Sequence, residues 1–168
     1  GVMDKPRFKN RFREGHSVVV MDVAPAHVTE VVACGGTAAK SSKEAASQAD
    51  VISTMLTDGC EVEAAVLGPG GILEGAAKGS TVVDMSSISP VVAQKVGAAC
   101  AAKGVEFLDA PVSGGEPKAI EGTLASMVGG DTTAFEKIEP ILMNRGASVT
   151  LTGPLGPGHV THPANPVQ

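Results

Sequence analysis

Apolar and polar positions along this chain follow two alternating patterns. Short runs rich in β-branched residues, such as "HSVVVMD" and "DVISTML", are typical of buried strands. Between them lie segments with helical spacing of apolar residues, bounded by capping residues, prolines and glycines. The pattern predicts strands over 16–22, 50–56, 80–87, 105–110, 123–130 and 148–153. It predicts helices over 25–35, 41–49, 59–68, 89–104 and 132–146.

The order of these elements predicts the fold class. Strands recur about every 25–30 residues and are separated by amphipathic helices, a spacing that favours βαβ units and a parallel sheet. Continuous apolar strands such as "VVV" indicate a sheet that is covered on both faces. We therefore predict an α/β protein with a mostly parallel sheet flanked by helices.

Composition narrows the class of protein. Hydrophobic residues make up 43% of the 168 residues but aromatic residues only 2%, so Val, Ile, Leu, Ala and Met must form the core. The net charge of −5 gives no support to nucleic-acid binding. Residues 1–15 carry five basic and two acidic residues, and this short arm leaves open contact with nucleic acid or an acidic partner.

Three cysteines lie far apart, and this spacing indicates reduced thiols in a cytoplasmic protein. No apolar run is long enough to cross a membrane, and the N-terminal residues lack the apolar stretch of a signal peptide. His159 and His162 have helical spacing, but no Cys or acidic residue lies near them in sequence, so we predict no metal site.

Ligands of open α/β sheets bind at the carboxyl ends of the strands, where this chain carries several candidate residues. Asp22 closes the 16–22 strand and could bind ribose hydroxyls, or cap the helix that follows. Met55 and Leu56 end the 50–56 strand and could pack on a flat ring. Ser87 could donate to a ligand or begin the cap of the next helix.

The stretch "DAPVSGG" (109–115) has the composition of a binding loop. Pro111 ends the strand ladder, and Ser113 offers a hydroxyl. Gly114 and Gly115 let backbone amides approach a ligand closely, which suits a carboxylate or another anion. The alternative interpretation is a tight turn without a ligand.

Several longer segments together resemble one family. "DVISTML", "LGPGGILEGAAKGSTVVDMSSISP" and "DAPVSGGEPKAIEGTLASMVGGD" are similar to segments of the β-hydroxyacid dehydrogenases, in the same order and without gaps. The resemblance implies a Rossmann domain that binds NAD or NADP, and hydride transfer between a small semialdehyde and its 3-hydroxy acid. Within the family, the segments look most like those of enzymes that reduce tartronate semialdehyde.

The resemblance also implies a domain division and a set of cofactor contacts. Residues 1–153 are expected to be a partial NAD(P)-binding domain that lacks the first Rossmann strand, and 154–168 a stub of the interdomain segment. The family's C-terminal helical domain is expected to be absent. Val23 stands where members that bind NADP often carry an Arg, which favours NAD over NADP. The implied cofactor-binding residues are Gly1, Met3, Asp22, Met55, Leu56 and Ser87.

Substrate and catalytic positions follow from the same resemblance. Ser113, Gly114 and Gly115 match the residues that hold the substrate carboxylate. His162 occupies the position of the family's catalytic Lys, the general acid, and Asn165 matches the Asn three residues later. We therefore expect a reductase fragment with a small-molecule substrate and a tendency to form homo-oligomers. The alternative is a non-catalytic domain that binds a nucleotide or a partner.

Overall fold

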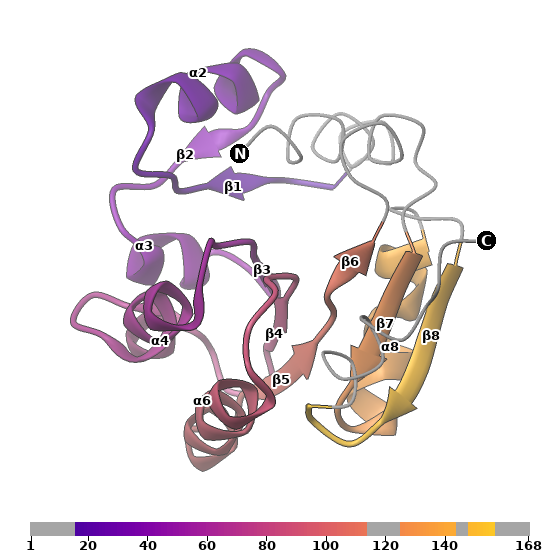
Figure 1. Ribbon diagram of the computed structural model, residues 1–168. Coiled ribbons are helices and arrows are strands. Elements are labelled where there is room, and N and C mark those ends of the chain that lie inside the picture. The colour runs from indigo at the N-terminus through magenta and orange to yellow at the C-terminus, as the bar shows by residue number, and fades with distance from the viewer. Residues whose placement is uncertain (1–15, 114–124, 144–147, 157–168) are drawn as a thin grey trace.

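The computed structural model describes residues 16–113, 125–143 and 148–156. Helices and strands alternate along most of this part of the chain, as the sequence pattern predicts (Figure 1). In chain order the elements are β1 (Val19–Val20), α2 (Pro25–Ala33), β2 (Thr37–Ala38), α3 (Ser42–Ala46), β3 (Val51–Thr54), α4 (Gly59–Leu67), α5 (Ile72–Gly75), β4 (Thr81–Asp84), α6 (Pro90–Ala102), β5 (Glu106–Asp109), β6 (Val112–Ser113), β7 (Ala125–Gly129), α8 (Thr132–Met143) and β8 (Ser148–Gly153).

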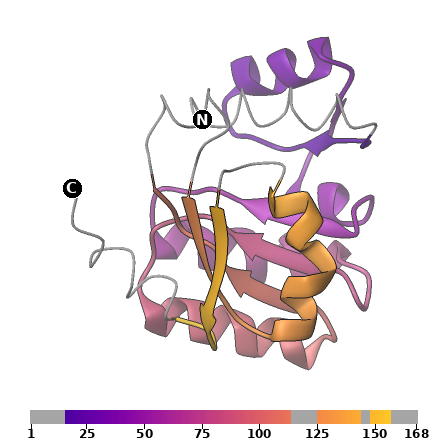
Figure 2. The same cartoon turned by 90° about the vertical axis from the view of Figure 1, so that its right-hand side faces the viewer.

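The strands form two sheets within the described residues. β1 and β2 pair in parallel as a two-stranded unit, with α2 packed on it at one end of the molecule (Figures 1 and 2). The larger sheet has the order β3-β4-β5-β7-β6, and β8 pairs with β7. β3, β4 and β5 are parallel, and β7 runs antiparallel to β5 and β6 but parallel to β8. The predicted mostly parallel, Rossmann-like α/β fold is confirmed.

The larger sheet has a core on each face. On one face, Val82 and Phe107 pack against helices α3, α4, α5 and α6. On the other, Val83 and Leu108 pack against α8, which Figure 2 shows in front of the strands. Alternate residues of each strand thus point to opposite cores, as pleating requires. Both faces of the larger sheet are therefore covered, and all four residues of its central strand β4 are buried.

Local sequence signals start the main helices where they were predicted. Pro25 opens α2 and Pro90 opens α6, and the Ser89 hydroxyl accepts a hydrogen bond from the Val92 backbone N–H. Asp58 caps α4 by accepting a hydrogen bond from the Glu61 backbone N–H. Among the residues described, no helix combines the length and the apolar character that a membrane span requires.

Element boundaries differ from the prediction in several places. The strand predicted over 16–22 is only Val19–Val20, and the strand predicted over 80–87 ends at Asp84. Each strand ends where its backbone leaves the ladder, although apolar residues continue beyond that point. Three short elements were not predicted at all: β2, α5 and β6. The two strands among them have two residues each, too few for a periodic signal, and form because a neighbouring strand supplies the hydrogen bonds.

Candidate functional site

A network of hydrogen bonds joins the carboxyl ends of β3 and β4. Its centre is the Asp84 carboxylate, which has no exposed surface. Asp84 Oδ1 accepts hydrogen bonds from Thr54 Oγ1 at 2.8 Å and from Ser86 Oγ at 2.6 Å. The Ser86 backbone N–H also donates to Oδ1, at 3.2 Å. One buried oxygen thus holds the last residue of β3 and the loop after β4.

Ser86 extends this network to the loop that follows β3. Its hydroxyl donates to Asp84 and accepts a hydrogen bond from the Leu56 backbone N–H at 2.9 Å. The Met85 N–H donates to the Thr54 carbonyl at 2.9 Å. Because both loops are tied to the same carboxylate, the segment that carries Met55 and Leu56 has a fixed position relative to the segment that carries Ser86 and Ser87.

Met55, Leu56 and Ser87 lie in these two loops. Met55 packs against the core beside α8, whereas Leu56 packs against the core beneath α4 and α6. Ser87 is exposed. The interpretation of Ser87 as the helix cap is wrong, because Ser89 caps α6. The loops therefore present partly buried apolar side chains and an exposed hydroxyl at the edge of the sheet where the strands end.

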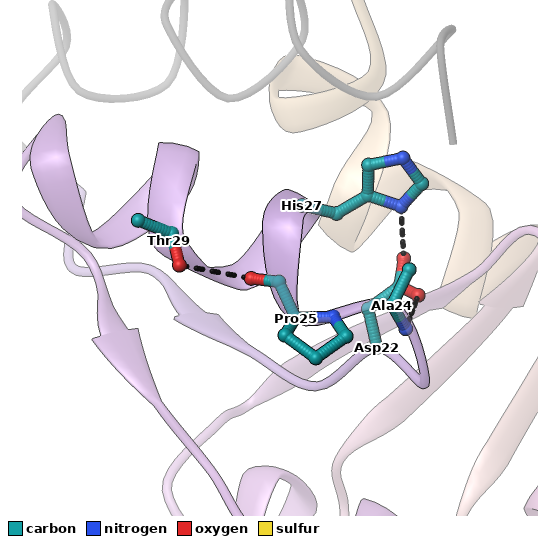
Figure 3. A network of polar contacts seen from close by, with 5 residues as sticks. All are labelled: Asp22, Ala24, Pro25, His27 and Thr29. Carbon is teal, nitrogen blue, oxygen red and sulfur yellow. Dashed lines mark hydrogen bonds and ion pairs between the residues drawn. The ribbon is translucent and has the colours of Figure 1, made fainter.

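A second polar cluster lies at the start of α2 (Figure 3). Asp22 Oδ1 accepts a hydrogen bond from the Ala24 backbone N–H at 2.8 Å, and Asp22 Oδ2 lies 3.0 Å from His27 Nδ1. Partial burial raises the pKa of the Asp22 carboxyl, but the hydrogen bonds from Ala24 and His27 outweigh it, and the pKa lies below its usual value. Asp22 is therefore ionised at neutral pH.

This geometry bears on both interpretations of Asp22, as a ribose-binding residue and as a helix cap. Its carboxylate orders the turn before α2 by accepting from the Ala24 N–H. Asp22 is not the N-cap residue of α2, however: that position is Ala24, and no side chain caps the helix there. The Asp22 side chain also stays partly exposed, at 24%, two residues after the end of β1. A carboxylate oxygen can accept more than one hydrogen bond, so Asp22 could order the turn and still accept from ribose hydroxyls.

The "DAPVSGG" segment begins at a buried carboxylate. Asp109 ends β5 with no exposed surface, and its Oδ1 accepts a hydrogen bond from the Gly156 N–H at 3.2 Å. Ser113 ends β6 and pairs with Ala125 of β7. The remaining predicted site residues lie outside the described part of the chain: Gly1, Met3, Gly114, Gly115, His162 and Asn165.

The described residues offer little other reactive chemistry. They contain no cluster of three or more His, Cys, Asp or Glu side chains that could hold a metal ion. Burial raises the pKa of the Cys100 thiol to about 12, so this cysteine is a small apolar core residue rather than a nucleophile.

Sequence reasoning missed Asp84, Ser86 and His27. The spacing of Asp84 and Ser86 is a local signal, because an Asp commonly accepts from the backbone N–H two residues later. The partner Thr54 is 30 residues away, and no local pattern points to it. His27 follows Asp22 by five residues, and the start of α2 brings the two together.

Comparisons with known proteins agree with this geometry. Residues 1–153 match the family model described as the NAD binding domain of 6-phosphogluconate dehydrogenase. The chain is 40% identical over 158 residues to 2-(hydroxymethyl)glutarate dehydrogenase of Eubacterium barkeri, which covers 94% of this chain and 52% of that protein. It is 36% identical over 167 residues to 2-hydroxy-3-oxopropionate reductase of Escherichia coli K12, with 99% and 57% covered.

A solved structure gives the same result. The fold matches 3-hydroxyisobutyrate dehydrogenase of Mycobacterium tuberculosis with a TM-score of 0.92 and 34% identity, covering 98% of this chain and 56% of that one. The chain thus spans about half the length of the curated relatives it matches. The resemblance inferred from the sequence is confirmed, and the chain belongs to the β-hydroxyacid dehydrogenase family.

Proposed function

We propose that this chain is the cofactor-binding part of an NAD(P)-dependent reductase that converts tartronate semialdehyde (2-hydroxy-3-oxopropionate) to glycerate. The observation that carries the proposal is the network around Asp84, which fixes two loops at the carboxyl ends of adjacent parallel strands. In folds of this type, nucleotides bind at that edge of the sheet. Similarity to 2-hydroxy-3-oxopropionate reductase of Escherichia coli supports the substrate.

Each described residue has a role in this proposal. Asp22 would accept hydrogen bonds from the adenosine ribose, and Met55 and Leu56 would pack along the nicotinamide end of the cofactor. Ser87, which is exposed and does not cap α6, would donate a hydrogen bond to the cofactor. The bound dinucleotide would supply the hydride that the carbonyl carbon accepts. The chain's own contribution is to bind and orient.

Substrate binding and proton transfer would fall to the residues implied by the family resemblance. Ser113, with the amides of Gly114 and Gly115, would hold the substrate carboxylate. His162 would deliver a proton to the carbonyl oxygen as the carbon is reduced, and Asn165 would support it. An imidazolium can act as a general acid near neutral pH. These roles rest on the sequence match alone.

For the cofactor, we propose NAD rather than NADP. The residue after Asp22 is Val23, whose side chain is 92% exposed and uncharged. A 2′-phosphate is usually accommodated by an Arg near this acid. Val23 offers no such charge, whereas the Asp22 carboxylate would repel a phosphate but accept from a free 2′-hydroxyl.

Calorimetry with NADH and NADPH, followed by an assay of NADH oxidation with tartronate semialdehyde, tests the proposal. We expect micromolar to millimolar binding of NADH by this chain, and at least tenfold weaker binding by Asp22→Ala, because a hydrogen bond to a charged group contributes about 1.5–3 kcal/mol. Ser47→Ala, an exposed change at the C-cap of α3, is the matched control. Absence of nucleotide binding would refute the proposal.

A second candidate function is a nucleotide-binding domain without catalysis. The observation that favours it is His162, which stands where the family resemblance places the catalytic Lys. NADH binding without turnover of tartronate semialdehyde would favour this candidate. Turnover that His162→Ala abolishes would exclude the non-catalytic candidate.

Analytical ultracentrifugation of the same preparation tests the expected homo-oligomer.

A further inference from the structure

The start of α2 holds a histidine in a defined orientation beside the proposed ribose-binding acid. His27 is the third residue of α2, and its side chain is 33% exposed. Its Nδ1 faces Asp22 Oδ2 at 3.0 Å, while Asp22 Oδ1 is occupied by the Ala24 N–H (Figure 3). The ring is therefore anchored at one nitrogen, and the other nitrogen points away from the carboxylate.

The Asp22 carboxylate determines which nitrogen carries hydrogen. An ionised carboxylate can only accept, so His27 Nδ1 must be the donor. In a neutral imidazole, Nε2 then has a lone pair and accepts. In a protonated imidazole, Nε2 becomes a second donor and carries positive charge. His27 Nε2 therefore changes from an acceptor to a cationic donor when the imidazole binds a proton.

No Lys or Arg competes with His27 in this unit. Residues 16–39, which include β1, α2 and β2, contain no Lys and no Arg. The ionisable residues of this unit and its exit are His16, Asp22, His27, Glu30, Cys34 and Lys40. Within residues 16–39, His16 and His27 are thus the side chains that can carry positive charge, and His27 Nδ1 is the one placed 3.0 Å from Asp22 Oδ2.

We infer that His27 is a specificity-determining residue that reads the 2′ position of the cofactor's adenosine ribose. Asp22 would accept a hydrogen bond from a 2′-hydroxyl whether His27 is neutral or protonated. When His27 is neutral, a 2′-phosphate would be repelled by the Asp22 carboxylate and by the lone pair of His27 Nε2. When His27 is protonated, Nε2–H would donate a charge-assisted hydrogen bond to the phosphate. Protonation of His27 should therefore tighten the binding of NADP and leave the binding of NAD little changed. This inference rests on the proposed function, because it assumes that Asp22 faces the ribose.

The experiment compares dissociation constants of NAD+ and NADP+ at about pH 8 and about pH 6, where histidine charge changes. The proteins are the unmodified chain, His27→Gln, and His16→Gln as the matched histidine control on the same unit. The unmodified chain and His16→Gln should gain about tenfold in NADP+ affinity relative to NAD+ at the lower pH. His27→Gln should lack this gain but keep its NAD+ affinity.

His27→Gln also supplies the correction for the cofactor's own titration, since a phosphate monoester changes charge near pH 6. Val23→Arg adds a permanent cation beside Asp22 at an exposed position. This variant should bind NADP+ more tightly than the unmodified chain at both pH values, with a smaller pH effect.

Two results would overturn the inference while leaving the proposed function intact. The first is a pH effect in His27→Gln that equals the effect in the unmodified chain. The second is an equal loss of NAD+ and NADP+ affinity in His27→Gln, which would indicate that His27 only orders the start of α2. Failure of the unmodified chain to bind either nucleotide would instead refute the proposed function, and the inference with it.

Discussion

Replacement of Asp84 by valine removes the acceptor that links β3 to β4. Valine is branched and of comparable size, so it fills the site without a carboxylate. The three groups that donate to Asp84 Oδ1 would lose their acceptor: the Thr54 hydroxyl, the Ser86 hydroxyl and the Ser86 N–H. Both residues that carry these groups, Thr54 and Ser86, are buried, so bulk water is poorly placed to replace the lost acceptor.

The expected loss of stability follows from the buried hydrogen bonds to Asp84 that the substitution removes. A buried donor left without an acceptor costs about 1–3 kcal/mol, although the two hydroxyls can rotate toward other acceptors. Removal of a buried charge offsets part of this cost, particularly because Asp84 Oδ2 has no hydrogen-bond partner among the described residues. We expect Asp84→Val to lower the free energy of unfolding by about 3 kcal/mol. Asp84→Asn keeps one acceptor oxygen and should cost about 1 kcal/mol or less.

Urea unfolding followed by far-ultraviolet circular dichroism gives these free energies. The chain has no Trp and no Tyr, so intrinsic fluorescence offers no useful signal. The midpoint should fall in Asp84→Val with little change in the slope, because the surface exposed on unfolding is similar. NADH affinity should fall as well, since the Leu56 loop loses its link through Ser86 to β4.

A double-mutant cycle with Ser86→Ala sharpens the test. Ser86 and Asp84 share two hydrogen bonds, so their effects should not add, and the coupling should be about 1–2 kcal/mol. If Asp84→Val unfolds at the same urea concentration as Asp84→Asn, the carboxylate does not hold the two strand ends together. Additive effects of Asp84→Val and Ser86→Ala would lead to the same conclusion.

Three further predictions concern packing, thiol chemistry and helix capping. Gly129→Ala should destabilise strongly, as a lowered thermal midpoint, because a Cβ there would clash with Asp109 Oδ1 and the Pro154 carbonyl; an unchanged midpoint would contradict this. With the pKa of the Cys100 thiol raised to about 12 by burial, a thiol reagent at about pH 8 should label the two exposed cysteines in the native chain. The third should react only after unfolding, and three native thiols would refute the prediction. Asp58→Ala should cost about 1 kcal/mol in urea unfolding, because it removes the acceptor for the Glu61 N–H; Asp58→Ser should restore most of it.

Helix starts and the central strands were predictable because their signals are local. Ser89 and Pro90 cap and open α6, and Asp58 caps α4, each within one turn of its helix. The central strands carry apolar pairs such as Val82–Val83 and Phe107–Leu108, because both faces of the sheet are covered. These properties depend on neighbours in sequence or on the average environment, and both leave a clear pattern in the residues.

By itself, the sequence determined the fold class, the family, and which strands precede the segments that carry candidate site residues. Only the tertiary structure decided how those ends are joined, because Thr54 meets Asp84 across 30 residues of intervening chain. The same holds for β2 and β6, which are too short to form without a paired strand. It also holds for His27, whose contact with Asp22 requires the turn that opens α2. Hydrogen bonds between distant residues depend on how the backbone packs, and no local pattern of residue types records that packing.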